Sequence, residues 1–288
     1  MRTPAGTSLI PLCALLAVSL PSLTLAALPQ SSSVPGGIAV IPLGTVSTNN
    51  KPPQAWLGEQ QIFVTAEGSR WYAVVGLALD TPAGSQELRV KSGDETKVLN
   101  FAVSARQYPE QRITLKDASK VQLSAADEER ANREIAVIQG LKRHWRNAPD
   151  TDPAFRLPAE GRLGGRFGVR RFFNGEPRSP HSGLDVVVAR GTPIKASASG
   201  KVLAVDDYFF NGKTVFVDHG NGLISMYCHL DRIDAQPGET VGKGQTLGLS
   251  GKTGRATGPH LHWSVVLNGA MVDPELFIAA ESSAKKRR

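Results

Sequence analysis

Cysteine is scarce in this chain of 288 residues, which contains only two. One of them, Cys13, lies in an apolar amino-terminal stretch that we expect to be removed, so Cys228 would be the only thiol of the mature chain. A single thiol excludes an intramolecular disulfide. The mature fold is therefore expected to be stabilised by contacts other than disulfides.

The chain also lacks an apolar run long enough to predict a retained membrane span. The amino-terminal run, residues 9–20, is interrupted by proline and is shorter than the roughly 20 residues that a transmembrane helix needs. It follows Arg2 and precedes small residues around Ala26, a pattern typical of a secretory signal. We expect residues 1–26 to be a cleaved signal peptide that sends the protein to the periplasm or cell envelope, with release from the cell left open.

The positive charges are not concentrated in one block. The formal net charge is +7 and falls to +6 when Arg2 is removed with the signal. Basic stripes with interleaved aromatics, typical of nucleic-acid binding, are missing, so we expect no nucleic-acid partner. The basic surface is either simply solvated or suits an acidic partner such as an anionic wall polymer. Residues 281–288 are expected to be a frayed basic tail.

The length of the chain favours two domains. Residues 35–108 contain apolar runs bounded by glycine and proline, which predict a small β-sandwich-like domain. Its strands are expected at residues 62–64, 71–79, 88–90 and 99–103. Because this segment holds no cluster of reactive side chains, we expect it to position, shield or bind, with restraint of the rest of the chain as one option.

Residues 109–156 are expected to form a helical linker. Ser124 can cap a helix over residues 124–147, and acidic residues follow it in the first turns, where the helix dipole favours them. An apolar stripe runs along the helix at Ile135, Ile138, Leu141 and Trp145. We predict that this stripe packs between the two β regions.

Residues 157–280 are dense in short apolar strands and glycine-containing turns, which predict an antiparallel all-β domain with almost no helix. Strands are expected at residues 201–205, 214–218, 223–227 and 262–267. The fold class is therefore mainly β. No internal repeat or low-complexity tract appears beyond a short serine run.

Four of the six histidines lie in three motifs of this region. His181 precedes Asp185 by four residues, His229 lies in Tyr-Cys-His-Leu, and His260 and His262 lie in Gly-Pro-His-Leu-His. Side chains alternate along a strand, so His260 and His262 should project to the same side. Two imidazoles and one carboxylate, with a position left for water, are the ligands of a hydrolytic zinc site. We expect His181, Asp185 and one strand histidine to supply them.

In order and spacing these motifs resemble the lysostaphin-like zinc peptidases, also called the LytM-type or M23 family. Residues 242–245 and 253–262 also match the family pattern, and the resemblance covers roughly residues 163–277. Residues 35–108 are similar to the amino-terminal domain that precedes the peptidase in some bacterial members. The resemblance implies hydrolysis of peptide bonds in peptidoglycan cross-links or bridges, with stem peptides as the substrate.

The same resemblance implies a role for each site residue. His181, Asp185 and His262 would bind Zn²⁺, and His229 and His260 would be the catalytic pair beside it. The chemistry agrees, because the chain has no His-Glu-x-x-His motif to supply a glutamate base, and an imidazole titrates near pH ~6.5. Which histidine takes the proton and which returns it stays open, as does a regulatory protein partner.

Other residues are expected to be structural. We assign His144 to the helix surface, His219 to a hairpin turn or groove wall, and Cys228 to the core, because alternation turns it away from His229. Residues 166–171 are expected to line a groove in which an arginine pairs with a stem-peptide carboxylate, or to be solvated.

Two other functions are compatible with parts of the pattern. An inactive relative could serve as a wall-binding scaffold or activate other wall hydrolases, but such relatives have usually lost metal ligands, and this chain retains them all. A cupin-like metalloenzyme also uses a two-histidine strand, yet it would leave the motif around His229 unexplained. A metallopeptidase is therefore the favoured prediction.

Overall fold

The computed structural model describes residues 28–46, 51–114 and 123–278. The expected signal peptide, residues 1–26, and the basic tail, residues 281–288, lie outside the described residues. Within the described ranges the chain has one α-helix, and this helix is not apolar enough to cross a membrane. Strands dominate the rest, which confirms the mainly β fold class.

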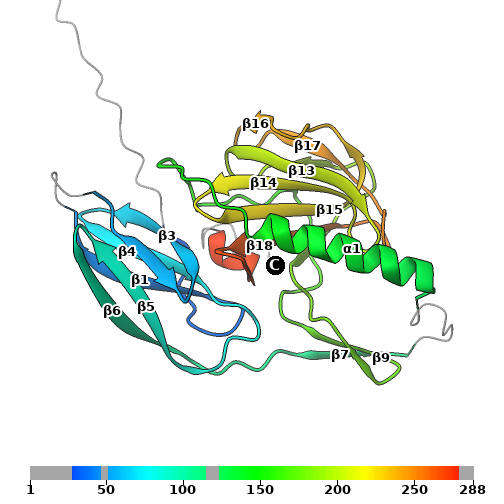
Figure 1. Cartoon of the computed structure of the whole chain (residues 1–288). Coiled ribbons are helices and arrows are strands. Elements are labelled where there is room, and N and C mark those ends of the chain that lie inside the picture. Colours follow the sequence, from blue (N-terminus) through cyan, green and yellow to red (C-terminus); the bar gives the residue numbers. More distant parts are fainter. Residues whose placement is uncertain (1–27, 47–50, 115–122, 279–288) are drawn as a thin grey trace, which may run out of the picture.

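The amino-terminal strands form one six-stranded antiparallel sheet in the order β1-β4-β3-β2-β5-β6. The strands are β1 (Ile38–Thr45), β2 (Gln54–Leu57), β3 (Gln60–Glu67), β4 (Arg70–Gly76), β5 (Gly84–Ser92) and β6 (Glu95–Val103). Apolar residues from both ends of this order share one core, because the sheet curls over on itself, as Figure 1 shows. The pattern did not predict β1, in which Pro42 and Gly44 flank a bulge and look like turn residues, or the short β2.

The carboxy-terminal region forms a larger antiparallel sheet with the main order β16-β13-β14-β15-β18-β11-β8. Its strands are β8 (Arg162–Leu163), β11 (Leu184–Val187), β12 (Pro193–Lys195), β13 (Gly200–Tyr208), β14 (Gly212–Gly220), β15 (Leu223–Ile233), β16 (Thr240–Val241), β17 (Thr246–Ser250), β18 (Leu261–Leu267) and β19 (Ala270–Val272). A short 3₁₀ turn, Pro274–Phe277, is the only helical piece of this region among the described residues. The four strands and the near absence of helix predicted here are confirmed.

The helix α1 spans Ala125–Lys142 and begins where the sequence predicts. The Ser124 hydroxyl accepts a hydrogen bond from the Asp127 amide at 3.1 Å, which satisfies one of the free amides of the first turn. The helix ends earlier than expected, and Trp145 lies beyond it against Gly222. The chain leaves the helix there and reaches the larger sheet, where Arg146 pairs with Asp218 at 2.5 Å.

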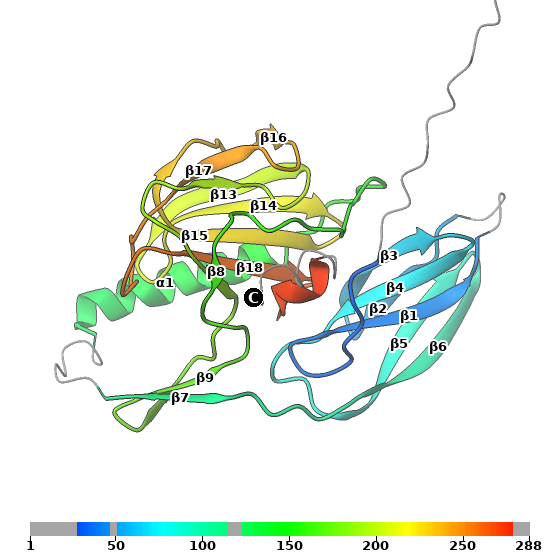
Figure 2. The same cartoon turned by 180° about the vertical axis from the view of Figure 1, so that it is seen from behind.

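The position of α1 differs from the prediction. Ile138 and Leu141 pack on an apolar cluster of the larger sheet, which includes Phe216 and Met226, while Ile135 stays 45% exposed. Figures 1 and 2 show the helix lying along that sheet. The expectation that α1 packs between the two β regions is therefore wrong. The apolar stripe of α1 is narrow, so a single apolar face of the larger sheet is enough to cover it.

A third, three-stranded sheet connects the two regions. It has the order β10-β9-β7, with β7 (Glu110–Ile113), β9 (Arg170–Phe173) and β10 (Glu176–Arg178). Strand β7 follows the amino-terminal sheet in sequence and pairs in parallel with β9, which precedes His181. The chain that leaves the amino-terminal sheet thus contacts the segment that leads into the first histidine motif.

The two β regions share an apolar core. Ile38, Phe63 and Val74 of the amino-terminal sheet belong to the same buried cluster as Val265 and Leu267 of β18. At the turn after β18, the Asn268 side chain lies between the sheets. With its amide oriented to satisfy both neighbours, its nitrogen donates to the Val74 carbonyl at 2.9 Å and its oxygen accepts from the Phe63 amide at 3.0 Å. These contacts join the regions at the end of β18 that lies away from His262.

Candidate metal centre

The paired strands β11 and β18 bring the predicted metal ligands together. Asp185 lies directly opposite His262 in the register of these strands, and His181 lies in the loop just before β11. Asp185 Oδ1 is 3.0 Å from His181 Nε2 and 2.9 Å from His262 Nδ1, and the two nitrogens are 3.0 Å apart. Three side chains separated by as much as 81 residues thus converge on one point.

Hydrogen bonds on the far side of each ring orient the imidazoles. His181 Nδ1 donates to the Arg166 carbonyl at 2.9 Å, which leaves Nε2 with a lone pair directed at Asp185. His262 Nε2 lies 2.9 Å from the Ser264 hydroxyl, so its Nδ1 faces the cluster. Such partners fix the tautomer and the ring orientation of metal-binding histidines. With His262 Nε2 donating to the Ser264 hydroxyl, both rings present an unprotonated nitrogen to a shared ligand.

Electrostatics favour the protonation states that a metal needs. Burial raises the pKa of Asp185, but its polar contacts with His181 and His262 outweigh burial and hold that pKa well below the usual range. Burial is the main cause that lowers the pKa of His262. The cluster thus combines a carboxylate anion with neutral imidazole, the donor forms that bind a divalent cation.

Two glycines make room for this cluster. A Cβ on Gly165 would lie 2.5 Å from Asp185 Oδ2, and one on Gly183 would lie 2.8 Å from His262 Nε2. Both distances are far below van der Waals contact, so only glycine fits. Gly183 lies inside the first histidine motif, and the pair Gly164-Gly165 precedes that motif, so both close approaches leave a signal in the sequence.

His229 and His260 lie beside the cluster. Their ring centroids are 4.8 Å apart, and His260 Nε2 is 3.8 Å from Asp185 Oδ1. The Nδ1 atom of His229 donates to the Thr253 carbonyl at 2.9 Å, and that of His260 to the Gly258 carbonyl at 2.9 Å. In the neutral form of each ring, the proton is therefore on Nδ1 and Nε2 is the acceptor. His260 precedes β18 rather than lying in it, yet it reaches the same carboxylate as His262.

The backbone at His229 is unusual. Its φ of 62° lies in the left-handed region, which a side chain other than glycine rarely adopts. Its amide donates to the Asn211 carbonyl at 2.8 Å, which supports this conformation. Burial, followed by His262 and His260, lowers the pKa of His229 to about 4. A neutral, firmly placed imidazole results, and neither Asn211 nor Thr253 was predicted as its support.

Three residues assigned to structural roles lie outside the cluster. The Cys228 thiol is buried on the other face of β15, and burial raises its pKa to about 11. The His219 ring is buried and bonds the Ser199 carbonyl at 2.8 Å and the Ser225 hydroxyl at 2.7 Å. His144 lies 3.5 Å from the Asp218 carboxylate. None of these three has the free, converging nitrogen or sulfur that a metal requires.

Arg171 of β9 differs from the other arginines of its segment. Arg166 pairs with Glu275 and Arg170 with Glu110, whereas the half-buried Arg171 has no ion pair among the described residues. Burial lowers its pKa, and the negative charge of Asp185 acts in the opposite direction. A desolvated guanidinium near the cluster is thus available to an anionic ligand.

Comparison with known proteins gives the family. The model of "Peptidase family M23" matches residues 179–274, and that of the "Peptidase family M23 N-terminal domain" matches residues 31–106. A crystal structure assigned to peptidase M23 from Pseudomonas aeruginosa is 42% identical, has a TM-score of 0.72, and matches 86% of this chain and 95% of its own. The chain belongs to peptidase family M23, a family of metallopeptidases, as the sequence motifs predicted.

Similar curated proteins act on the bacterial cell wall. The peptidoglycan DD-endopeptidases ShyA and ShyC of Vibrio cholerae are 36% identical over 132 residues and 45% identical over 94 residues, which is 44% and 33% of this chain. The DD-carboxypeptidase/endopeptidase Mpg of Neisseria meningitidis is 38% identical over 94 residues, or 33% of this chain. The matches span only 31%, 22% and 22% of these relatives, so this chain covers less than a third of the length of each.

Proposed function

We propose that this protein is a zinc-dependent endopeptidase that hydrolyses peptide bonds in peptidoglycan cross-links or bridges. One observation carries the proposal: a carboxylate and two oriented imidazoles converge within 3.0 Å of one another, with two further histidines beside them. Membership of peptidase family M23 and the names of the similar endopeptidases support it. An inactive scaffold would have no need to keep all five side chains.

The residues present fit a zinc ion. Two imidazole nitrogens and one carboxylate oxygen form a donor set that zinc accepts readily, whereas magnesium and calcium prefer oxygen alone. His181, Asp185 and His262 would hold the ion, since they are the group whose ligand atoms converge. Bound zinc would supply Lewis-acid activation for the attack of water on a peptide carbonyl.

His229 and His260 would move the protons. In its neutral form each presents Nε2 as the acceptor, because its Nδ1 proton bonds a backbone carbonyl. An imidazole in this state can accept a proton from the attacking water and return one to the leaving amine. Their backbone bonds keep both rings in place during this exchange, which reduces the reorganisation that the reaction requires.

The substrate would be a stem peptide with free carboxylates. Arg171 offers a half-buried cation that forms no ion pair within the described part of the chain, and a guanidinium binds a carboxylate through two parallel hydrogen bonds. Peptidoglycan lies outside the cytoplasmic membrane, so the proposal requires export to the periplasm or cell envelope, which residues 1–26 would direct. A regulatory protein partner is compatible with this location.

Digestion of purified peptidoglycan tests the proposal. The zinc-loaded protein is expected to release muropeptides whose masses identify the bond that is cut, and Asp185→Ala is expected to release none. Asp231→Ala is the matched control, because Asp231 is a carboxylate paired with Arg190 outside the cluster. Binding of peptidoglycan without release would contradict the peptidase and favour the scaffold.

A further inference from the structure

The support of His229 comes from two loops that contact each other. The loop between β13 and β14 provides the Asn211 carbonyl that accepts the His229 amide at 2.8 Å. The second loop lies between β17 and β18, and its Thr253 carbonyl accepts a hydrogen bond from His229 Nδ1 at 2.9 Å. The Arg255 amide of this second loop donates to the Phe210 carbonyl at 3.0 Å, which joins the two. A shift of the β13–β14 loop would therefore move both supports of the ring.

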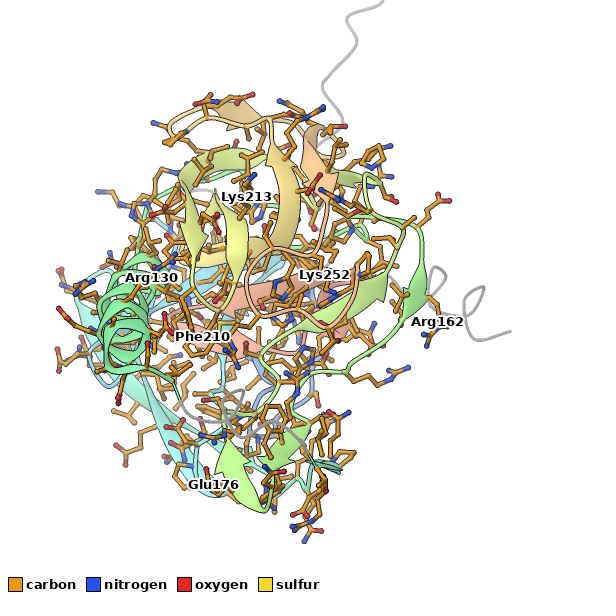
Figure 3. The ribbon with its side chains drawn as sticks, turned by 90° about the vertical axis from the view of Figure 1, so that its right-hand side faces the viewer. Arg130, Arg162, Glu176, Phe210, Lys213 and Lys252 are labelled. Carbon is orange, nitrogen blue, oxygen red and sulfur yellow. The ribbon has the colours of Figure 1, made fainter. Side chains whose placement is uncertain are left out.

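Helix α1 holds this loop from outside. Glu134 Oε2 accepts the Phe209 amide at 2.6 Å, and Glu134 Oε1 pairs with Arg130 Nε at 2.6 Å. Arg130 Nη2 in turn donates to the Asp207 carbonyl at 2.8 Å. Figure 3 labels Arg130 on α1 and Phe210 in the loop between β13 and β14. Arg130 thus binds the backbone of β13 near its end, and Glu134 binds the backbone at the start of the loop.

The aromatic ring of the loop adds to this contact. The guanidinium carbons of Arg130 and Arg255 both lie 5.8 Å from the centre of the Phe209 ring, so the ring meets a cation from the helix and one from the second loop. A left-handed φ at a histidine is costly and persists only where its surroundings determine it. The helix contacts are part of those surroundings.

Helix α1 has a second ion pair that serves as a control for the pair of Arg130 and Glu134. Arg133 and Glu129 form another pair with four-residue spacing, but both side chains are well exposed, at 65% and 74%. Glu134 is only 21% exposed, because it covers the β13–β14 loop. The two pairs therefore share their helix and their chemistry but not their contact with the loop.

We propose that Glu134, together with Arg130, is a positioning residue for His229 and acts through the loop of residues 209–211. Helix α1 is then part of the catalytic unit and not only a connection to it. This inference rests on the proposed function for its effect on turnover. Its geometric content, the orientation of the His229 ring, is independent of that function.

The test compares Glu134→Ala with Glu129→Ala in the full-length, zinc-loaded protein. With soluble cross-linked muropeptide dimers, Glu134→Ala is expected to lower kcat about tenfold at unchanged KM and zinc content, because small displacements of a catalytic group are costly. Glu129→Ala is expected to stay within about twofold. Glu134→Gln keeps an acceptor for the Phe209 amide and is expected to recover most of the lost kcat.

A second readout does not depend on turnover. The NMR resonance of the His229 Nδ1 proton, which bonds the Thr253 carbonyl, is expected to shift or broaden in Glu134→Ala and to stay unchanged in Glu129→Ala. Equal kcat and equal resonances in the two variants would overturn the inference. If Glu134→Ala does not fold, Arg130→Ala takes its place, and an unshifted His229 resonance there overturns the inference as well. An inactive wild-type protein would contradict the proposed function alone, because the His229 Nδ1 proton resonance still tests whether Glu134 positions the ring.

Discussion

The two β regions are built from similar antiparallel strands, yet they bury different kinds of side chain. Of the described residues, every buried polar or charged side chain lies between Thr151 and Asn268, and the amino-terminal sheet buries apolar side chains only. A buried polar group is costly unless it is hydrogen-bonded, so a sheet that serves only as scaffold has no reason to hold one. In the larger region His181, His229, His262 and Ser264 belong to the candidate centre or orient it, whereas others, such as His219 and Asn268, form hydrogen bonds elsewhere.

The largest expected effect is the loss of the centre itself. Replacing Asp185 by Ala removes the anion that both imidazoles face, so bound zinc and activity are expected to disappear together. Metal analysis of the purified variant, beside peptidoglycan digestion, checks this. An Asp185→Ala protein with full zinc and normal turnover would show that the cluster is only a polar core.

The next effect separates chemistry from metal binding. His229→Ala and His260→Ala are expected to keep the fold and most of the zinc but to lose at least about 10²-fold in turnover, as when a positioned proton-transfer group is removed. Zinc content and kcat on muropeptide dimers are measured for both, with His262→Ala as the variant that loses metal. If His229→Ala or His260→Ala loses zinc as completely as His262→Ala, that histidine is a ligand.

A third effect tests whether the two regions are independent. Phe63 belongs to the amino-terminal sheet but is 1% exposed in the core shared with β18, so Phe63→Ala is expected to destabilise the whole chain by about 3–5 kcal/mol. Val98→Ala on the exposed face, at 55%, is expected to change stability by less than about 0.5 kcal/mol. Chemical unfolding followed by probes in both regions measures this. Two separate transitions, with only the first shifted by Phe63→Ala, would show that the core is not shared energetically.

The smallest effect concerns a buried polar residue outside the centre. Burial lowers the pKa of His219 from 6.5 to about 4, so the folded state holds it neutral while the unfolded chain takes up a proton as the pH falls. The contribution of neutral His219 to the free energy of unfolding is complete above pH 6.5 and decreases towards pH 4. The decrease between pH 7 and pH 5 is about 2 kcal/mol. Unfolding of zinc-free wild type and His219→Gln at both pH values is compared. An equal loss in the two proteins would assign the pH dependence to other groups.

The motifs around His181, Asp185 and His262 indicated which side chains to expect near one another, and the structure brings these three together. The choice of His262 rather than His260 came from the family resemblance, because alternation along a strand does not distinguish them. The place of α1 could not be predicted, because an apolar stripe shows that a helix packs but not on which surface. Asn211 and Thr253 support His229 through backbone carbonyls, which every residue has, so their identities gave no signal.

The shared core also sets the order of events in folding. Phe63 and Val74 are made early, but the residues that cover them, Val265 and Leu267, follow roughly 200 positions later, a separation that makes formation of this contact slow. Until β18 arrives, the amino-terminal sheet must keep an apolar patch in water, where it is open to aggregation and proteolysis. Because β18 also carries His262, the strand that closes this patch is the one that completes the metal centre. A chain that ends before β18 would therefore lack both the cover of this patch and His262 of the candidate metal site.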